Sequence, residues 1–127
     1  MAYRFDKHYT CAEARALLPQ VRKWLERMRQ LRQQMETCDE RLQALREAGA
    51  DLGGELVNTL VKTLAQIREL LLEFYRREIQ IKDLTRGLID FPAIIAGKEV
   101  FLCWEQHEQD IEHWHELDAG YAGRRPL

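Results

Sequence analysis

The sequence has few of the features that mark several large protein classes. Only three of its 127 residues are cysteines (Cys11, Cys38 and Cys103), and none belongs to a C-x-x-C pair. A disulfide-stabilised secreted domain has a denser and even-numbered set, so a cytoplasmic protein is expected. No apolar run is long enough to span a membrane, and the first residues contain no signal-peptide core.

Phosphate-binding and hydrolase motifs are missing too. There is no Gly-rich phosphate loop, no His-Glu-x-x-His and no Gly-x-Ser-x-Gly. The net charge of −2 disfavours a general polyanion binder. Arg15, Arg22 and Arg29 repeat every seven residues, but this row is expected to be the solvated flank of a helix rather than a nucleic-acid interface.

Two long helices are predicted in the first two thirds of the chain. Thr10 and Glu13 can form a capping box at the start of the first helix, expected over residues 10–47 and kinked near Pro19. Its apolar residues alternate by three and four, as in a coiled-coil seam. They are Ala14, Leu17, Val21, Trp24, Met28, Leu31, Met35, Cys38, Leu42 and Leu45. The Gly-rich stretch 48–54 then predicts a turn.

A second helix is expected over residues 55–80, running antiparallel to the first. Its predicted seam consists of Val57, Leu60, Leu64, Ile67, Leu71 and Phe74. Further apolar residues lie off that seam: Leu56, Val61, Leu70, Leu72 and Tyr75. One partner helix cannot cover both sets, so the C-terminal segment or a second subunit has to contribute. We expect a homodimer formed through the second helix.

The C-terminal third changes character. A β-hairpin is predicted over residues 87–105, with Gly97 in its turn and Pro92 placing the first strand at an edge. Residues 106–118 are expected to form a short helix, followed by a loop over 119–127. A strand is the competing prediction, because apolar residues and histidines alternate at Ile111, His113, His115 and Leu117. The predicted fold class is therefore mainly α, a single domain in which a long helical hairpin carries a small β-hairpin and a short helix.

Chemistry-bearing residues concentrate in this last part, which is acidic and holds three of the four histidines. On a helix, Glu108, Glu112 and His115 would share a face; on a strand, His113 and His115 would. Asp90 and Cys103, on adjacent predicted strands, are further candidate ligands for a divalent metal such as Zn, Mn or Fe. The competing interpretation is plain packing, with Trp104, Ile111 and Trp114 in the core and the acids in solvent.

Two other residues allow alternative roles. Cys103 is a candidate nucleophile beside His115, although a lone cysteine between apolar residues is more often a small buried hydrophobe. Arg124 can hold an anion, but an ion pair with the acidic segment is favoured.

The spacing of particular residues resembles a bacterial family called domain of unknown function 2203. The matching C-terminal residues are Lys82-Asp83, Gly87 to Pro92, Gly97, Leu102 to Trp104, Glu108, Ile111, Trp114-His115, Gly120, Gly123-Arg124 and Pro126. Tyr9-Thr10, Glu13-Ala14 and Leu17 to Pro19 resemble the family's opening, so the resemblance covers nearly the whole chain. It implies a small cytoplasmic bacterial protein and brings no activity with it.

The family motif singles out Asp90, Cys103, Trp104, Glu108, Trp114, His115 and Arg124. As a pair of metal ligands, the motif thus favours Glu108 with His115 over Glu112 with His115. It implies structural roles for Trp104 and Trp114. One position departs from the motif: His107 stands where the family usually has glycine. If that glycine has a positive φ, the turn before Glu108 is altered in this chain.

Three functions follow, in order of preference. The first is an interaction or regulatory module, homodimeric and not an enzyme. The second is a metal-binding protein or metal-dependent hydrolase that uses Asp90, Cys103, Glu108 and His115. The third is an enzyme with Cys103 as nucleophile.

Overall fold

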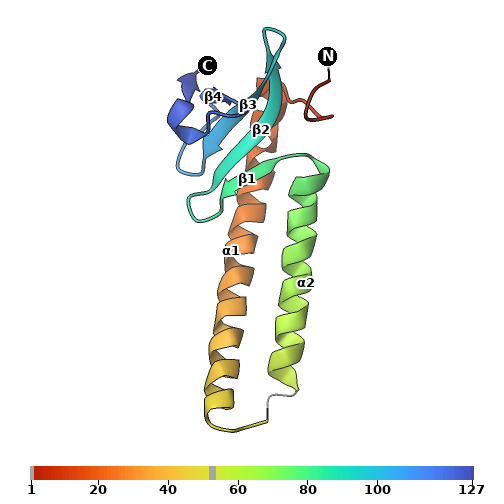
Figure 1. Cartoon of the computed structure of the whole chain (residues 1–127), viewed down its shortest axis with the longest axis vertical. Helices are drawn as coiled ribbons and strands as arrows, with labels where there is room; N and C mark the ends of the chain where they lie inside the picture. Colours follow the sequence, from red (N-terminus) through yellow and green to blue (C-terminus); the bar gives the residue numbers. More distant parts are fainter. Residues whose placement is uncertain (1, 52–53) are drawn as a thin grey trace. The chain divides into compact units, whose positions relative to one another are not determined.

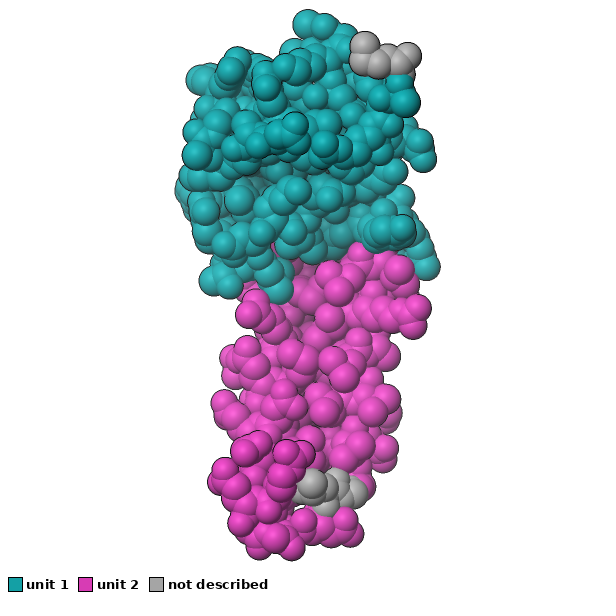
Figure 2. All heavy atoms as spheres, viewed as in Figure 1, with its two compact units in different colours: residues 1–23, 73–127 teal, residues 24–72 magenta. Residues whose placement is uncertain are grey.

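The computed structural model describes residues 2–51 and 54–127, and in these ranges it contains two long antiparallel helices followed by a five-stranded antiparallel sheet (Figure 1). Helix α1 covers Cys11–Glu47 and helix α2 covers Glu55–Arg76. The chain divides into two compact units (Figure 2). Residues 24–72 form the hairpin unit, and residues 1–23 with 73–127 form the sheet unit.

The first helix begins with the predicted capping box. The Glu13 amide donates to Thr10 Oγ1 at 3.1 Å, and the Thr10 amide donates to Glu13 Oε1 at 2.9 Å. Two amides that the helix itself leaves unpaired are thereby satisfied. The helix continues without interruption through Pro19. In the predicted turn, Gly49 and Gly54 have φ of 71° and 85°, while Leu52 and Gly53 lie outside the described residues.

The predicted apolar seam of α1 is buried or half-buried along its length. The seam predicted for α2 is correct only in part, since Leu60 and Ile67 are half-buried and Phe74 is buried but the other three members are exposed. Val57, Leu64 and Leu71 are exposed by 37%, 47% and 47%. Thr63 is buried instead, at 1% exposure, and Leu70 is half-buried. The apolar residues of α2 form two overlapping three-four series one position apart, so periodicity alone does not fix which series packs inward.

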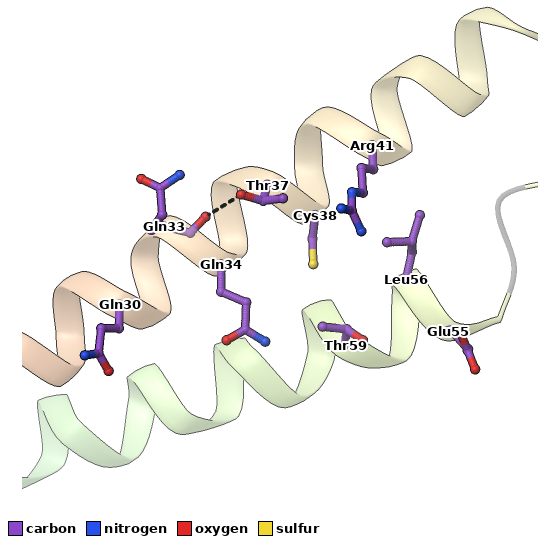
Figure 3. Close-up of a pocket in the computed structure, with 9 residues that line it drawn as sticks. All are labelled: Gln30, Gln33, Gln34, Thr37, Cys38, Arg41, Glu55, Leu56 and Thr59. Carbon is purple, nitrogen blue, oxygen red and sulfur yellow. Dashed lines mark hydrogen bonds between the residues drawn. The ribbon is translucent and has the colours of Figure 1, made fainter.

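The hairpin unit also contains an open pocket between its two helices (Figure 3). Cys38 points from α1 toward α2, where Leu56 and Thr59 line the opposite side, and Gln34 lies one turn away. The remaining lining consists of the uncharged Gln30, Gln33 and Thr37 and of the charged Arg41 and Glu55, so the pocket offers mainly hydrogen-bonding atoms with one charge of each sign.

The sheet is larger than the sequence suggests. Its strands are β1 (Gln80–Asp83), β2 (Leu88–Ile95), β3 (Lys98–Glu105), β4 (His113–Glu116) and β5 (Arg125–Pro126), in spatial order β1-β2-β3-β4-β5 across the described residues. A short 3₁₀ helix, η1, covers Tyr121–Gly123. The fold is therefore roughly α/β, and the prediction of a mainly α fold is correct only for the helical hairpin. The outer strands have two to four residues, too few to show a clear alternation.

Three local predictions are corrected. The second helix ends at Arg76 rather than residue 80, because the chain turns at Glu78 (φ 57°) and enters β1. The short helix over residues 106–118 does not form, and the competing strand does, because Trp114 of β4 pairs with Leu102 of β3. Pairing with an existing strand edge satisfies backbone groups that a short helix would leave unpaired at its two ends.

Pro92 does not mark an edge strand, because β2 lies between β1 and β3. The β1 pairing extends only as far as Asp90, so it ends before Pro92 is reached. The Pro92 carbonyl accepts from the Tyr9 amide at 2.7 Å, on the side of β2 away from β3. The amide nitrogen and the carbonyl oxygen of one strand residue point to the same side. The nitrogen of Pro92 therefore also points away from β3, and its lack of a hydrogen removes no hydrogen bond between β2 and β3.

The start of α1 covers one face of the sheet inside the sheet unit. The Tyr9 ring meets Phe91 edge-on at 5.5 Å, and the Arg22 guanidinium lies 4.8 Å from the Trp104 ring centre. Phe91 and Trp104 are both fully buried. The opposite face, which carries Asp90, Phe101 and Cys103, holds the candidate site.

Candidate metal centre

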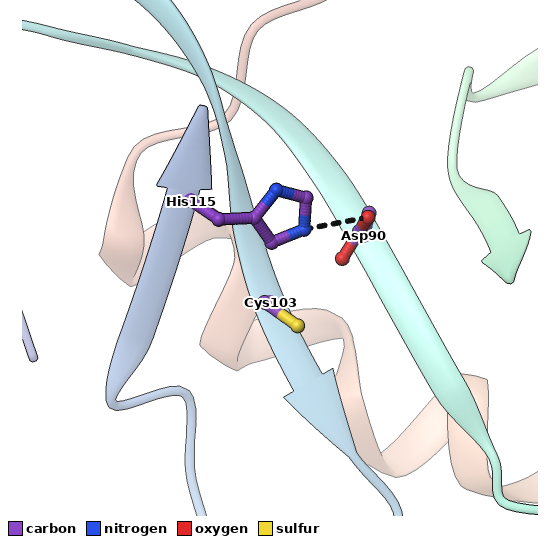
Figure 4. Close-up of side chains that lie close together, drawn as sticks. All are labelled: Asp90, Cys103 and His115. Atoms are coloured by element: carbon purple, nitrogen blue, oxygen red, sulfur yellow. Dashed lines mark hydrogen bonds and ion pairs between the residues drawn. The ribbon is translucent and has the colours of Figure 1, made fainter. Parts of the chain in front are cut away.

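Three potential ligands converge from three neighbouring strands (Figure 4). Asp90 of β2 pairs directly with Cys103 of β3, and His115 of β4 pairs with Phe101, two residues before Cys103. Side chains two apart on a strand share a face, so all three project from the same side of the sheet. Their ligand atoms lie within 4.8 Å of one another, and this is the cluster of that kind found among the described residues.

The cluster is enclosed by protein. Asp90, Cys103 and His115 are exposed by only 1%, 0% and 2%. The Phe101 ring centre lies 5.5 Å from that of His115, so part of the enclosure is aromatic. Ionisable groups at such depth are costly unless another charge or a hydrogen bond compensates them.

The hydrogen bonds of His115 determine which ring nitrogen is available. Nδ1 lies 2.7 Å from the Glu116 carbonyl oxygen, which only accepts, so Nδ1 carries a proton. Nε2 lies 2.9 Å from Asp90 Oδ2. In the neutral ring Nε2 then has a lone pair directed at the carboxyl group of Asp90. The two atoms repel unless a proton or a cation lies between them.

In the described residues no arginine or lysine forms an ion pair with Asp90, and the charges of Lys82 on Asp90 and of Arg124 on Cys103 offset burial only in part. Asp90 Oδ1 is buried without a hydrogen-bond partner in the described part of the chain. Burial raises the pKa of the Asp90 carboxyl group, although His115 and Cys103 partly oppose this. Burial also raises the pKa of the Cys103 thiol, and the neighbouring Asp90 raises it further. Burial therefore opposes ionisation of both groups as long as no cation is bound.

The family comparison adds a classification to this geometry. The model of a family described as an uncharacterized conserved protein, DUF2203, matches residues 7–127. The chain belongs to the DUF2203 family. This confirms the resemblance inferred from the sequence. No curated protein and no solved structure matches the chain, and no helix in residues 2–51 and 54–127 is long and apolar enough to cross a membrane.

Glu108, the fourth candidate ligand, lies apart from the cluster and pairs with Arg124 instead. Arg124 Nη2 donates to Glu108 Oε1 and Oε2 at 2.6 and 2.8 Å, and lies 3.0 Å from His113 Nδ1. The Arg124 and Glu108 side chains are exposed by only 11% and 15%. Burial is the largest single influence and would lower the pKa of Arg124, but the hydrogen bond and the charge of Glu108, together with contributions from Cys103 and Tyr121, outweigh it and the pKa is raised.

The two motif tryptophans of this DUF2203 protein have packing roles. Trp104 is fully buried, and its Nε1 donates to the Glu108 carbonyl at 3.0 Å. Trp114 is half-buried, with the Arg125 guanidinium 5.3 Å from its ring centre. His107 causes no backbone strain, because the non-glycine residues with positive φ in the described ranges are Glu78 and Ala96.

Arg15 and Arg22 have a role that the sequence reasoning missed. Arg15 Nη2 donates to the Ile111 carbonyl at 2.7 Å, and Arg22 donates to the Gln106 and Glu108 carbonyls at 3.1 and 2.9 Å. These guanidinium groups hydrogen-bond to the segment between β3 and β4, although Arg15 is also exposed to solvent as the sequence predicts. Their seven-residue spacing was the available signal, since it places both on one face of α1.

Proposed function

We propose that this DUF2203 protein binds a transition-metal ion through Asp90, Cys103 and His115. The convergence of three ligand types within 4.8 Å in a buried position supports the proposal most directly. The unpartnered Asp90 Oδ1 supports it independently, because a buried acceptor with no donor is suited to a cation. The Nδ1 bond of His115 to a backbone carbonyl is the orienting contact that metal-binding histidines usually make.

The donor set favours zinc or iron over manganese. A thiolate and an imidazole are ligands of Zn²⁺ and Fe²⁺, whereas Mn²⁺ prefers carboxylate, carbonyl and water oxygens. A bound dication would stabilise the thiolate of Cys103 and the carboxylate of Asp90, opposing the effect of burial on both groups. Binding would release protons, so the affinity should fall as the pH falls.

The burial of the site supports a structural role for the ion rather than a hydrolytic one. Three protein ligands leave a fourth position of the ion for a water molecule, but the ligands are at most 2% exposed, so that position is closed to a substrate from solvent. The same burial and the raised pKa of the thiol argue against Cys103 as a nucleophile. The ion would link β2, β3 and β4, which supply one ligand each.

The test is the metal content of protein purified without a histidine tag, before and after reconstitution with Zn²⁺, Fe²⁺ or Mn²⁺. We expect one ion per chain, bound by the wild type and lost in Cys103→Ser. Loading with Co²⁺ gives a second readout, because thiolate ligation produces a near-ultraviolet charge-transfer band that requires Cys103. A protein that takes up no ion and melts at the same temperature with and without each metal would refute the proposal.

Two matched controls separate ligation from general damage. Cys38→Ser replaces another buried cysteine, in the hairpin unit, and should retain the ion. Glu108→Gln removes the candidate that lies outside the cluster and should also retain it. Loss of metal in Glu108→Gln but not in His115→Ala would mean that the ligand set is wrong.

An interaction module remains the second candidate. The exposed apolar residues of α2 favour it, because Val61 and Tyr75 are exposed by 59% and 78% in addition to Val57, Leu64 and Leu71. A structural metal site is compatible with this role, since it would stabilise the sheet unit without taking part in the contact.

A further inference from the structure

The N-terminal segment, residues 3–8, is part of the sheet unit but forms neither a helix nor a strand. Four consecutive backbone amides of this segment donate to two side-chain carboxylates. They are Arg4 and Phe5, which donate to Glu99 at 2.8 and 3.0 Å, and Asp6 and Lys7, which donate to Glu78 at 2.9 and 2.8 Å. These bonds lie outside the strand ladders, so the segment can detach while the sheet stays intact.

The N-terminal segment contacts the face of the sheet that carries the candidate metal centre. Glu99 and Phe101 alternate with Cys103 along β3, so the three side chains project from the same face. The ring centre of Phe101 lies 5.4 Å from that of Phe5 and 5.5 Å from that of His115. A single aromatic ring therefore connects Phe5 of the segment to one of the three candidate ligands.

His8 attaches the other end of the segment to the same carboxylate. Its Nε2 lies 2.7 Å from Glu99 Oε2, and the two side chains are exposed by only 18% and 9%. Phe5 and His8 are half-buried, whereas the remaining residues of the segment are exposed. Glu99 thus accepts from two amides and binds one imidazole, so removal of its charge would weaken three attachments of the segment at once.

We propose that residues 3–8 form a gate that opens to admit a metal ion to Asp90, Cys103 and His115. These ligands are at most 2% exposed, so an ion reaches them only when a covering part of the protein moves away. Strands β2 and β3 are each paired on both sides, and α1 covers the opposite face, whereas the N-terminal segment is attached through side chains and opens at lower cost. Its role in metal exchange rests on the proposed metal site; the opening itself does not.

A gate predicts a specific kinetic pattern. It supplies no ligand, so loosening it should speed metal uptake and metal release by the same factor and leave the Kd unchanged. Glu99→Gln should speed both at least about tenfold, because it removes hydrogen bonds to a charged group. Uptake of Co²⁺ is followed through its thiolate band, and release is started with excess EDTA. Faster release with a proportionally weaker Kd would mean that the segment holds the ion in place, and would overturn the gate.

Alkylation of Cys103 tests the opening in metal-free protein. In a Cys11→Ser background, iodoacetamide should label Cys103 slowly, and at least about tenfold faster when Glu99→Gln is added. Cys38 is buried in the hairpin unit and serves as the internal reference, since general unfolding would expose it too. Phe5→Ala should also speed the labelling of Cys103, and it changes no charge that could alter the reactivity of the thiol.

The two readouts separate this proposal from the metal site. Unchanged labelling of Cys103 in both variants would overturn the gate even if the protein binds Co²⁺. If Co²⁺ does not bind, the metal site and metal exchange through the gate are both refuted, whereas faster labelling would still support the opening.

Matched controls make comparable changes elsewhere in the sheet unit. Glu73→Gln removes a carboxylate that forms an ion pair on α2, and Tyr75→Ala removes an aromatic ring that is 78% exposed. Both should leave labelling and metal exchange unchanged, and an equal acceleration by the controls would overturn the proposal. Arg124→Met loosens the C-terminal segment instead. If it speeds the labelling and Glu99→Gln does not, then the site opens on the C-terminal side and the proposal is wrong.

Discussion

The sheet unit contains two clusters that each combine a carboxylate with a histidine of β4 but differ in their balance of charge. Glu108 is matched by Arg124 at 2.6 Å and accepts a further bond from the Glu105 amide. Asp90 has His115 at 2.9 Å, one oxygen without a partner in the described residues, and no arginine or lysine in direct ion-pair contact. The chain supplies its own cation at the first cluster. The second cluster is the one that an external cation would complete.

Removing the metal ion should cause the largest change in unfolding free energy of the experiments that compare the two clusters. If an ion completes the Asp90 cluster, a chelator should destabilise the wild type by about 4 kcal/mol relative to protein held at a thousandfold excess of free metal over Kd. The measurement is thermal or denaturant unfolding with and without chelator. His115→Ala should unfold at the same denaturant concentration whether or not chelator is present, because it binds no ion.

Breaking the internally balanced pair comes next. Arg124→Met leaves the carboxylate of Glu108 largely buried without its counter-charge, and should cost about 2 kcal/mol of unfolding free energy, since partial exposure softens the penalty. The bound metal should remain. Denaturant unfolding with metal analysis checks both points, and a parallel loss of metal would mean that the two clusters are one site.

The neutral variant of each acid should then have opposite effects in metal-free protein. The pKa of Asp90 is raised in the folded state, so the contribution of this group to the stability of the metal-free wild type is most favourable below the ordinary aspartate pKa of about 4 and is lost as pH rises through the folded value. Asp90→Asn should therefore be more stable than metal-free wild type at pH 7, with the difference vanishing at low pH.

Glu108→Gln is the counterpart of that experiment. It removes the partner of Arg124 and should destabilise the protein at pH 7. Unfolding curves of both variants between pH 3 and 8 give the comparison. If Asp90→Asn is the less stable of the two at pH 7 without metal, then the charge imbalance assigned to the Asp90 cluster is incorrect.

The smallest effect is expected at His113, which borders the balanced cluster. Its Nδ1 lies 3.0 Å from Arg124 Nη2 and its side chain is 31% exposed. His113→Ala should change the unfolding free energy by less than about 1 kcal/mol and leave the metal content unaltered. A larger loss, or a loss of metal, would show that His113 and not His115 is the important histidine of β4.

Part of the candidate site was predictable because a β-hairpin is a local structure. Gly97 fixes a tight turn, and once that turn is set, counting outward pairs Asp90 with Cys103. His115 was predicted as a ligand, but the sequence did not determine which other ligands lie beside it, since a helix would have placed it with Glu108. The decisive contact is the pairing of β4 with β3, which places His115 opposite Phe101, 14 positions earlier in the chain.

The limit is similar in the hairpin unit. The three-four spacing of α1 and α2, with glycines between, determines two antiparallel helices. It does not determine which of two adjacent series on α2 faces α1, since both are apolar. Burial of Thr63 and exposure of Leu64 are the outcome of packing against α1 as a whole.

The sequence alone therefore determines the elements that depend on near neighbours: the capping box at Thr10, the long helices, the Gly97 hairpin and the family. Tertiary structure decides the strands β1, β4 and β5, the rotation of α2, and the separation of Glu108 from Asp90, Cys103 and His115. The physical reason is the same in each case. Short strands and helix faces gain most of their stabilising free energy from contacts with residues that are distant in sequence. The spacing of nearby residues does not identify those contacts.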